Sequence, residues 1–144
     1  MVRKPKQIPR LHSDLPLDQV VSINLTNPDK PFRTRDHITA RLGSNTAKLP
    51  RAWCWNGANV PQFFWSIFGI SQHDPRAIIA SGFHDFGCED DETPQVVADA
   101  NFAALLGPIE FNGVLLPGLN RWRVTLGYIG IRFYSVFVRP FKSE

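Results

Sequence analysis

The chain has 144 residues, of which 43% are hydrophobic and 20% are charged. This composition provides a core for one folded domain and excludes an intrinsically disordered chain, and two cysteines are too few for a disulfide-dense secreted module. The net charge of +3 is unevenly distributed, because residues 43–120 hold three basic and eight acidic side chains while both flanks are basic. This separation favours an anionic partner at the basic ends, or attraction between the ends and the acidic middle.

The first segment predicts an extended basic arm. Residues 1–16 contain three prolines, which disfavour a helix, and the first ten residues hold four basic side chains and no acidic one. No apolar run follows this basic start, so we expect no signal peptide. The longest apolar stretch, residues 124–138, is too short and too charged to span a bilayer, so we expect no transmembrane helix. We divide the chain into an arm over residues 1–16 and a single domain over residues 17–144.

The domain begins with strand patterns and continues with helical ones. Alternating apolar residues predict strands at 20–25, 37–42 and 47–55, and Pro50 breaks the last of these, which we therefore expect at an edge. Proline and capping signals predict helices over residues 61–68, 74–88, 95–106 and 120–139, with a loop over residues 107–119. We therefore expect an α+β fold, in which a small N-terminal antiparallel β-sheet is followed by three to four helices with a central antiparallel helix hairpin.

The last predicted helix carries a polar stripe. Polar residues recur in it every three or four positions, which is a helical period, whereas strand alternation fails at residues 129–131. We expect a helix that is buried over most of its surface, with the stripe facing solvent. The alternative is a row of arginines, Arg121, Arg132 and Arg139, that binds an anion or a partner. The complete stripe is Arg121, Thr125, Tyr128, Arg132, Ser135 and Arg139.

A histidine and an aspartate occupy matching positions in the predicted helix hairpin. His84 and Asp99 are equally distant in sequence from the middle of the linker at residues 89–92, so they can face each other across the two helices. A carboxylate that faces an imidazole fixes its tautomer and raises its basicity, which produces a general base. The alternative is a structural hydrogen bond between the two helices.

The same region offers metal ligands. Asp85 follows His84 directly and can supply an oxygen ligand to a cation, and the carboxylates of residues 89–92 lie just beyond the helix end. His84 and Cys88 are four residues apart and Cys54 is a candidate for a third zinc ligand, but neither thiol belongs to a paired motif, so zinc is not favoured. A disulfide between Cys54 and Cys88 is left open.

One resemblance concerns the origin of the chain. Residues 50–61 (PRAWCWNGANVP) are similar to the loop of a phage and prophage family known as domain-of-unknown-function family 1353. This resemblance implies a tailed-phage or prophage origin, a location in the virion or the infected bacterial host cell, and other virion proteins as partners. The further motifs that follow in the family's order are Phe63-Phe64-Trp65, His84-Asp85-Phe86, Ala98-Asp99-Ala100-Asn101-Phe102 and Ile131-Arg132-Phe133.

A second resemblance concerns chemistry. The run His84-Asp85-Phe86-Gly87, with Asp99 on the next helix, is similar to the centre of phospholipases A2. The resemblance implies that His84 is the base, that Asp99 orients it and that Asp85 binds calcium together with a loop containing Asn56 and Gly57. Calcium is the cofactor so implied, and it would polarise an ester carbonyl.

Two functions remain open from the sequence. The first is a calcium-dependent ester hydrolase that acts on phospholipid of the host envelope, with anionic membrane lipid as its partner. The second is a non-catalytic virion component of the neck, tail or capsid surface, which contacts other virion proteins or further copies of itself. We do not expect a nucleic-acid partner, because the basic residues form no recognisable reading motif.

Overall fold

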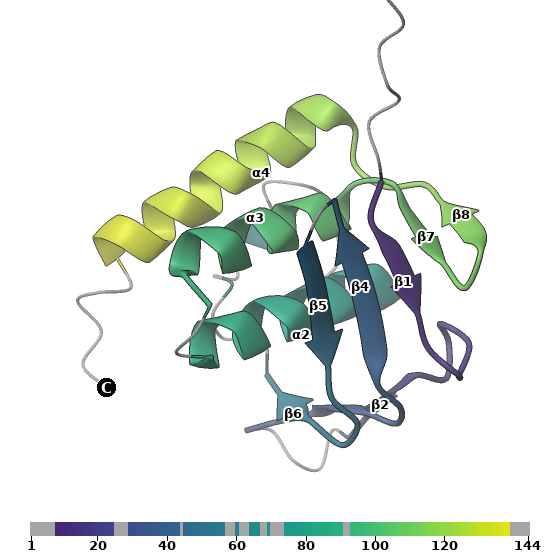
Figure 1. Ribbon diagram of the computed structural model, residues 1–144. Helices are drawn as coiled ribbons and strands as arrows, with labels where there is room; N and C mark the ends of the chain where they lie inside the picture. Colours follow the sequence, from purple (N-terminus) through teal and green to yellow (C-terminus); the bar gives the residue numbers. More distant parts are fainter. Residues whose placement is uncertain are drawn as a thin grey trace, which may run out of the picture.

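The computed structural model describes residues 8–24, 29–43, 45–56, 60, 64–66, 69, 74–90 and 93–138. Within this part of the chain, two small sheets lie beside a group of helices (Figure 1). The predicted α+β class is confirmed. The predicted helix over residues 61–68 lies mostly outside the described residues.

A five-stranded sheet forms one layer of the domain. Its strands lie in the order β5-β4-β1-β7-β8, with β1 parallel to β7 and antiparallel to β4. The central strand β1 comes from the segment that the sequence assigns to the extended arm, so at least this part of the segment belongs to the sheet. The bounds are β1 (Arg10–His12), β4 (Ile38–Leu42), β5 (Asn45–Leu49), β7 (Ile109–Phe111) and β8 (Val114–Leu116).

The hairpin of β7 and β8 lies in a segment that the sequence predicts to be a loop, and this prediction is wrong. The two strands are joined by Asn112 and Gly113, whose φ angles are +50° and +84°. Positive φ at both central residues is typical of the type I′ turn that connects antiparallel strands. The Asn112-Gly113 pair is therefore the signal in the sequence that marks this hairpin.

A second, three-stranded antiparallel sheet has the order β2-β3-β6. Pro50 breaks the predicted strand over residues 47–55, as expected, because proline cannot continue a ladder of backbone hydrogen bonds, and its two parts are edge strands of different sheets. Thr34 supports the chain at this point: its Oγ1 donates to the Pro50 carbonyl at 2.6 Å and accepts from the Trp53 amide at 2.9 Å. The bounds are β2 (Val21–Ile23), β3 (Phe32–Thr34) and β6 (Cys54–Trp55).

The helices begin where the capping residues predict. Asp74 caps α2 by accepting a hydrogen bond from the Arg76 amide at 2.9 Å, and Asn120 caps α4 by accepting from the Arg123 amide at 2.9 Å. In space α3 lies between α2 and α4, and α2 packs against β5 (Figure 1). The bounds are α2 (Pro75–Glu89), α3 (Gln95–Leu106), α4 (Arg121–Phe133) and the π-helical turn η1 (Tyr134–Val138).

The core is packed between the sheets and the pair α2 and α3. The indole of Trp55 lies against the backbone of Gly82 so closely that a Cβ there would approach Trp55 Cζ2 to 2.8 Å. The indole nitrogen donates to Ser81 Oγ at 3.1 Å, so the buried ring is also satisfied as a donor. Other buried apolar side chains include Leu11, Ile38, Leu49, Phe64, Ile79, Phe83, Phe102, Leu105, Ile109 and Phe111.

The last helix differs from its prediction. We expected it to be buried over most of its surface, but in α4 only Gly127 and Ile131 are buried. Large apolar side chains along α4 and η1 are instead exposed, among them Trp122 at 70% and Phe133 at 60%. No helix in the described part of the chain is long and apolar enough to cross a membrane.

Candidate functional site

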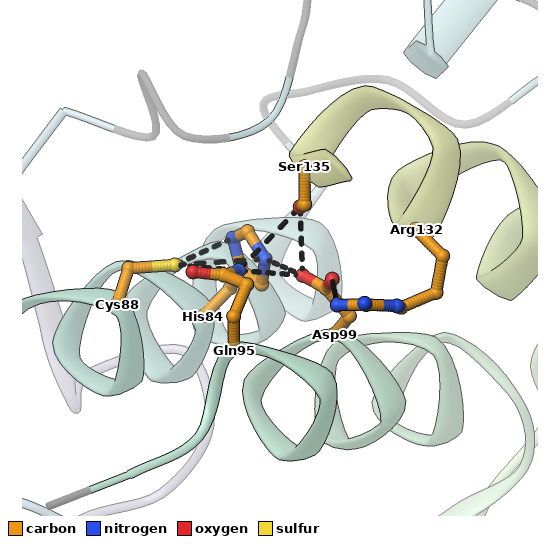
Figure 2. A network of polar contacts seen from close by, with 6 residues as sticks. All are labelled: His84, Cys88, Gln95, Asp99, Arg132 and Ser135. Carbon is orange, nitrogen blue, oxygen red and sulfur yellow. Dashed lines mark hydrogen bonds and ion pairs between the residues drawn. The ribbon is translucent and has the colours of Figure 1, made fainter. Parts of the chain in front are cut away.

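The helix hairpin brings His84 of α2 and Asp99 of α3 into contact, as the spacing predicts. His84 Nε2 lies 2.7 Å from Asp99 Oδ1, and both side chains are 0% exposed (Figure 2). Small residues allow this approach: a Cβ added at Gly87 would lie 3.0 Å from the Cβ of Ala98 on the facing helix. The pair therefore sits inside the contact between two helices.

Asp99 receives hydrogen bonds from three further side chains. Gln95 Nε2 and Ser135 Oγ donate to Oδ1 at 2.8 Å and 3.2 Å, and Arg132 donates to Oδ2 at 2.8 Å. The carboxylate thus joins α2, α3, α4 and η1 at one point, and Figure 2 shows the donors converging on it from these elements. Arg132 and Ser135 belong to the polar stripe, so this part of the stripe faces inward and not toward solvent. We call His84, Gln95, Asp99, Arg132 and Ser135 the Asp99 cluster.

Gln95 and Ser135 are members of this cluster that were not among the predicted site residues. Gln95 lies four residues before Asp99, so it shares the same face of α3. Ser135 lies three residues after Arg132 in the polar stripe. The spacing of Gln95 from Asp99 and that of Ser135 from Arg132 are the signals in the sequence that identify these two residues as partners of a buried Asp99.

The cluster holds opposite charges in a buried environment. Burial alone would lower the pKa of His84, but the hydrogen bond with Asp99, followed by the contact with Cys88, outweighs burial and raises the pKa from 6.5 to about 9. Burial alone would likewise raise the pKa of Asp99, but hydrogen bonds from His84, Gln95 and Arg132 keep it below 3.8. At neutral pH, His84 is therefore an imidazolium and Asp99 a carboxylate.

Cys88 contacts the histidine without forming a catalytic pair with it. Its Sγ lies 3.9 Å from His84 Nδ1 and 3.8 Å from Nε2. A sulfur equally distant from both ring nitrogens lies away from the axis of either N–H group, so the geometry is not that of a thiolate activated by histidine. Gln95 Nε2 also donates to this sulfur at 3.3 Å. Cys54 and Cys88 are both thiols and are not joined in a disulfide.

The proposed calcium ligands are only partly described. Asp85 is buried on α2, Asn56 is exposed after β6, and Gly57 lies outside the described residues. Calcium requires six to eight oxygen ligands. Among the described residues, the group of three acidic, histidine or cysteine side chains with ligand atoms close together is not at Asp85. It consists of Asp14, Asp36 and His37. Calcium at Asp85 therefore stays a prediction.

The three arginines of the predicted binding row do not act together in the described structure. Arg121 is exposed at the start of α4, whereas Arg132 lies about three turns further along and contacts Asp99. Arg139 lies outside the described residues. Arg132 therefore has a structural partner within the domain, and the outward positive charge of α4 is carried by Arg121 and Arg123.

His84 and Asp99 are also separate from the open surface. A cleft of about 640 Å³ lies between β5, α2 and α3, and its walls include Lys48, Phe83, Phe86 and Asn101. His84 and Asp99 do not line it. A general base must present an unprotonated nitrogen to its substrate. In this structure His84 is 0% exposed and its contact with Asp99 raises its pKa to about 9, so the arrangement is that of a buried ion pair.

Comparison of the chain with protein-family models, curated proteins and solved structures found no match.

Proposed function

We propose that this chain is a non-catalytic structural component of a tailed-phage particle, placed in its neck, tail or capsid surface. The observation that carries the proposal is the complete burial of the His84–Asp99 pair, in which neither side chain is exposed. The His84 side chain presents no exposed atom to a substrate in this arrangement, and a protonated imidazole has no lone pair with which to accept a proton.

The Asp99 cluster has a clear structural task. Asp99 collects hydrogen bonds from side chains of α2, α4 and η1 as well as from its own helix. Removing one partner of a buried ion pair is strongly destabilising, because the other charge remains buried without compensation. The cluster therefore fixes the position of α4 against the hairpin of α2 and α3. A protein that packs against neighbouring subunits in a particle requires such a fixed arrangement of its helices.

Two features support a role in a particle. The motifs of the sequence occur in the order of the phage family that they resemble, over about residues 38–135. The surface of the last helix exposes a row of large apolar side chains, and soluble monomers rarely expose large contiguous apolar patches. Such a surface is typical of a protein that contacts something else in its working state.

The test measures whether the protein hydrolyses phospholipid and whether it is incorporated into phage particles. The purified protein is incubated with phospholipid vesicles and calcium, beside a His84→Gln variant whose folding is checked by circular dichroism, and fatty acid release is measured against a known phospholipase. We expect no release from wild type. In parallel, mass spectrometry of purified particles should find many copies of the chain per particle. Fatty acid release from wild type that the variant abolishes would contradict the proposal.

The ester hydrolase is the second candidate, and one observation favours it. The 2.7 Å contact between His84 and Asp99 across two helices is the relation that the phospholipase resemblance requires. In that function His84 would take a proton from water, and calcium held by Asp85, Asn56 and Gly57 would polarise the ester carbonyl. Because His84 must first lose a proton, its activity would rise with pH toward about 9. A vesicle assay that shows no release at any pH between 6 and 10 excludes this candidate.

A further inference from the structure

A continuous apolar face runs along the outside of the last helix. Its members recur every three or four residues, so they lie on one side of the helix. The exposed fractions range from 40% to 70%, and the rings of Phe133 and Phe137 lie 4.8 Å apart on this face. We call it the α4 apolar face, and it consists of Trp122, Leu126, Ile129, Phe133, Val136 and Phe137.

Positive charge borders this face. Arg121 and Arg123 are exposed on either side of Trp122, and residues 121–138 contain no acidic side chain. By the 100° turn between successive residues, Arg123 lies along one margin of the face while Arg121 and Arg132 lie along the other. The partial positive charge of the helix N-terminus adds to the charge of Arg121 and Arg123. The occupant of the face therefore has an apolar interior and an anionic surface.

The charges beside the α4 apolar face favour some binding partners over others. A second copy of the chain would place two positively charged helices together, with no acidic side chain on either helix to neutralise them. α4 lies at the edge of the domain, with α3 between it and α2 (Figure 1), and the side chains of the α4 apolar face are exposed. Aromatic and aliphatic side chains on one face, with arginines at its margins, are typical of helices that lie in the plane of a membrane surface.

We infer that the α4 apolar face docks on the surface of an anionic lipid bilayer. The helix and its π-helical turn, 18 residues in all, span about 25 Å and would lie parallel to the membrane plane. Trp122 and Phe133 would enter the boundary between headgroups and acyl chains, and Arg121 and Arg123 would contact lipid phosphates. This inference does not depend on the proposed role in a particle, since it rests on the surface of α4 alone.

The test is co-sedimentation with vesicles of phosphatidylglycerol and phosphatidylethanolamine in equal parts, compared with phosphatidylcholine vesicles. Wild type should bind the anionic vesicles in low salt and bind phosphatidylcholine at least about tenfold more weakly. The double variant Trp122→Ser/Phe133→Ser should lose at least tenfold in partition coefficient. The double variant Arg121→Gln/Arg123→Gln should lose about 10- to 30-fold on anionic vesicles only.

A matched control comes from β8, the edge strand of the five-stranded sheet. Val114 and Leu115 of β8 are exposed apolar residues comparable to those of the α4 apolar face. The variant Val114→Ser/Leu115→Ser should bind as wild type does, and circular dichroism should show that all three variants fold. Absence of wild-type binding to anionic vesicles overturns the inference, as does equal loss in the control. A concentration-dependent dimer that only Trp122→Ser/Phe133→Ser dissociates would assign the face to a second copy instead.

Discussion

Replacing Asp99 with asparagine removes the negative charge that His84 and Arg132 share, while the side chain keeps its shape. An amide can still accept the hydrogen bonds of Gln95 and Ser135 through its oxygen. It cannot compensate the positive charges of His84 and Arg132, which contact the carboxylate at 2.7 Å and 2.8 Å. The structure therefore predicts a loss of stability that comes mainly from uncompensated buried charge.

The size of this loss follows from the histidine. The pKa of His84 is raised from 6.5 to about 9. One pKa unit corresponds to about 1.4 kcal/mol, so the interactions that hold the imidazolium in place are worth about 3 kcal/mol. Breaking a buried ion pair by removing one partner typically costs about 3–5 kcal/mol, which agrees with this value. We expect Asp99→Asn to lower the free energy of unfolding by about 3 kcal/mol at pH 6.

Urea unfolding at pH 6, followed by circular dichroism, measures this difference. Asp18→Asn is the matched control, because Asp18 is exposed, and it should change the free energy of unfolding by less than about 0.5 kcal/mol. If Asp99→Asn also lowered the free energy of unfolding by less than about 1 kcal/mol, the Asp99 cluster would not stabilise the packing of the helices as proposed.

Three further predictions concern stability. Because the pKa of His84 is higher in the folded state, the free energy of unfolding should fall by about 3 kcal/mol as pH rises from 6.5 to 9, and this fall should vanish in a variant without the carboxylate. Gly82→Ala should lower the free energy of unfolding by about 1–3 kcal/mol, because the added methyl group overlaps Trp55. Gly130→Ala should raise it by about 0.5–1 kcal/mol, because a Cβ at this helical position meets no atom within 4 Å. Arg76→Lys should lose about 1–2 kcal/mol, because the guanidinium donates to carbonyls at the end of α3 and at Pro117. Thermal and urea unfolding check the last two, and an unchanged stability in Gly82→Ala or Arg76→Lys would refute the corresponding contact.

The sequence predicted the parts of the fold that local signals control. Proline and capping signals marked the middle helices, so the predicted bounds of α2 and α3 lie within one residue of those in the structure. The facing of His84 and Asp99 followed from helix geometry and a short linker. Local signals did not reveal that β1 is the central strand of the sheet and pairs with β4 and β7, because these partners lie far from β1 in the sequence.

The orientation of the last helix could not be predicted from its own pattern. Hydrophobic periodicity favours burial of the apolar face, and on that basis alone the polar stripe should point to solvent. In the structure a buried carboxylate on α3 requires cationic and hydrogen-bonding partners, and Arg132 and Ser135 supply them. The hydrogen bonds of Arg132 and Ser135 with Asp99 hold this part of the polar stripe against the domain. The opposite side of the helix, which carries Trp122 and Phe133, is therefore exposed.

The protonation of His84 tests the central claim most directly. Nitrogen-15 NMR of the imidazole ring reports whether one or both ring nitrogens carry a proton. A sealed ion pair with Asp99 predicts that both nitrogens are protonated at pH 7.5 and that His84 titrates at about pH 9. A neutral ring at pH 7.5, with a pKa near the ordinary 6.5 and an Nδ1 that exchanges with water, would contradict the structural role and would support a general base.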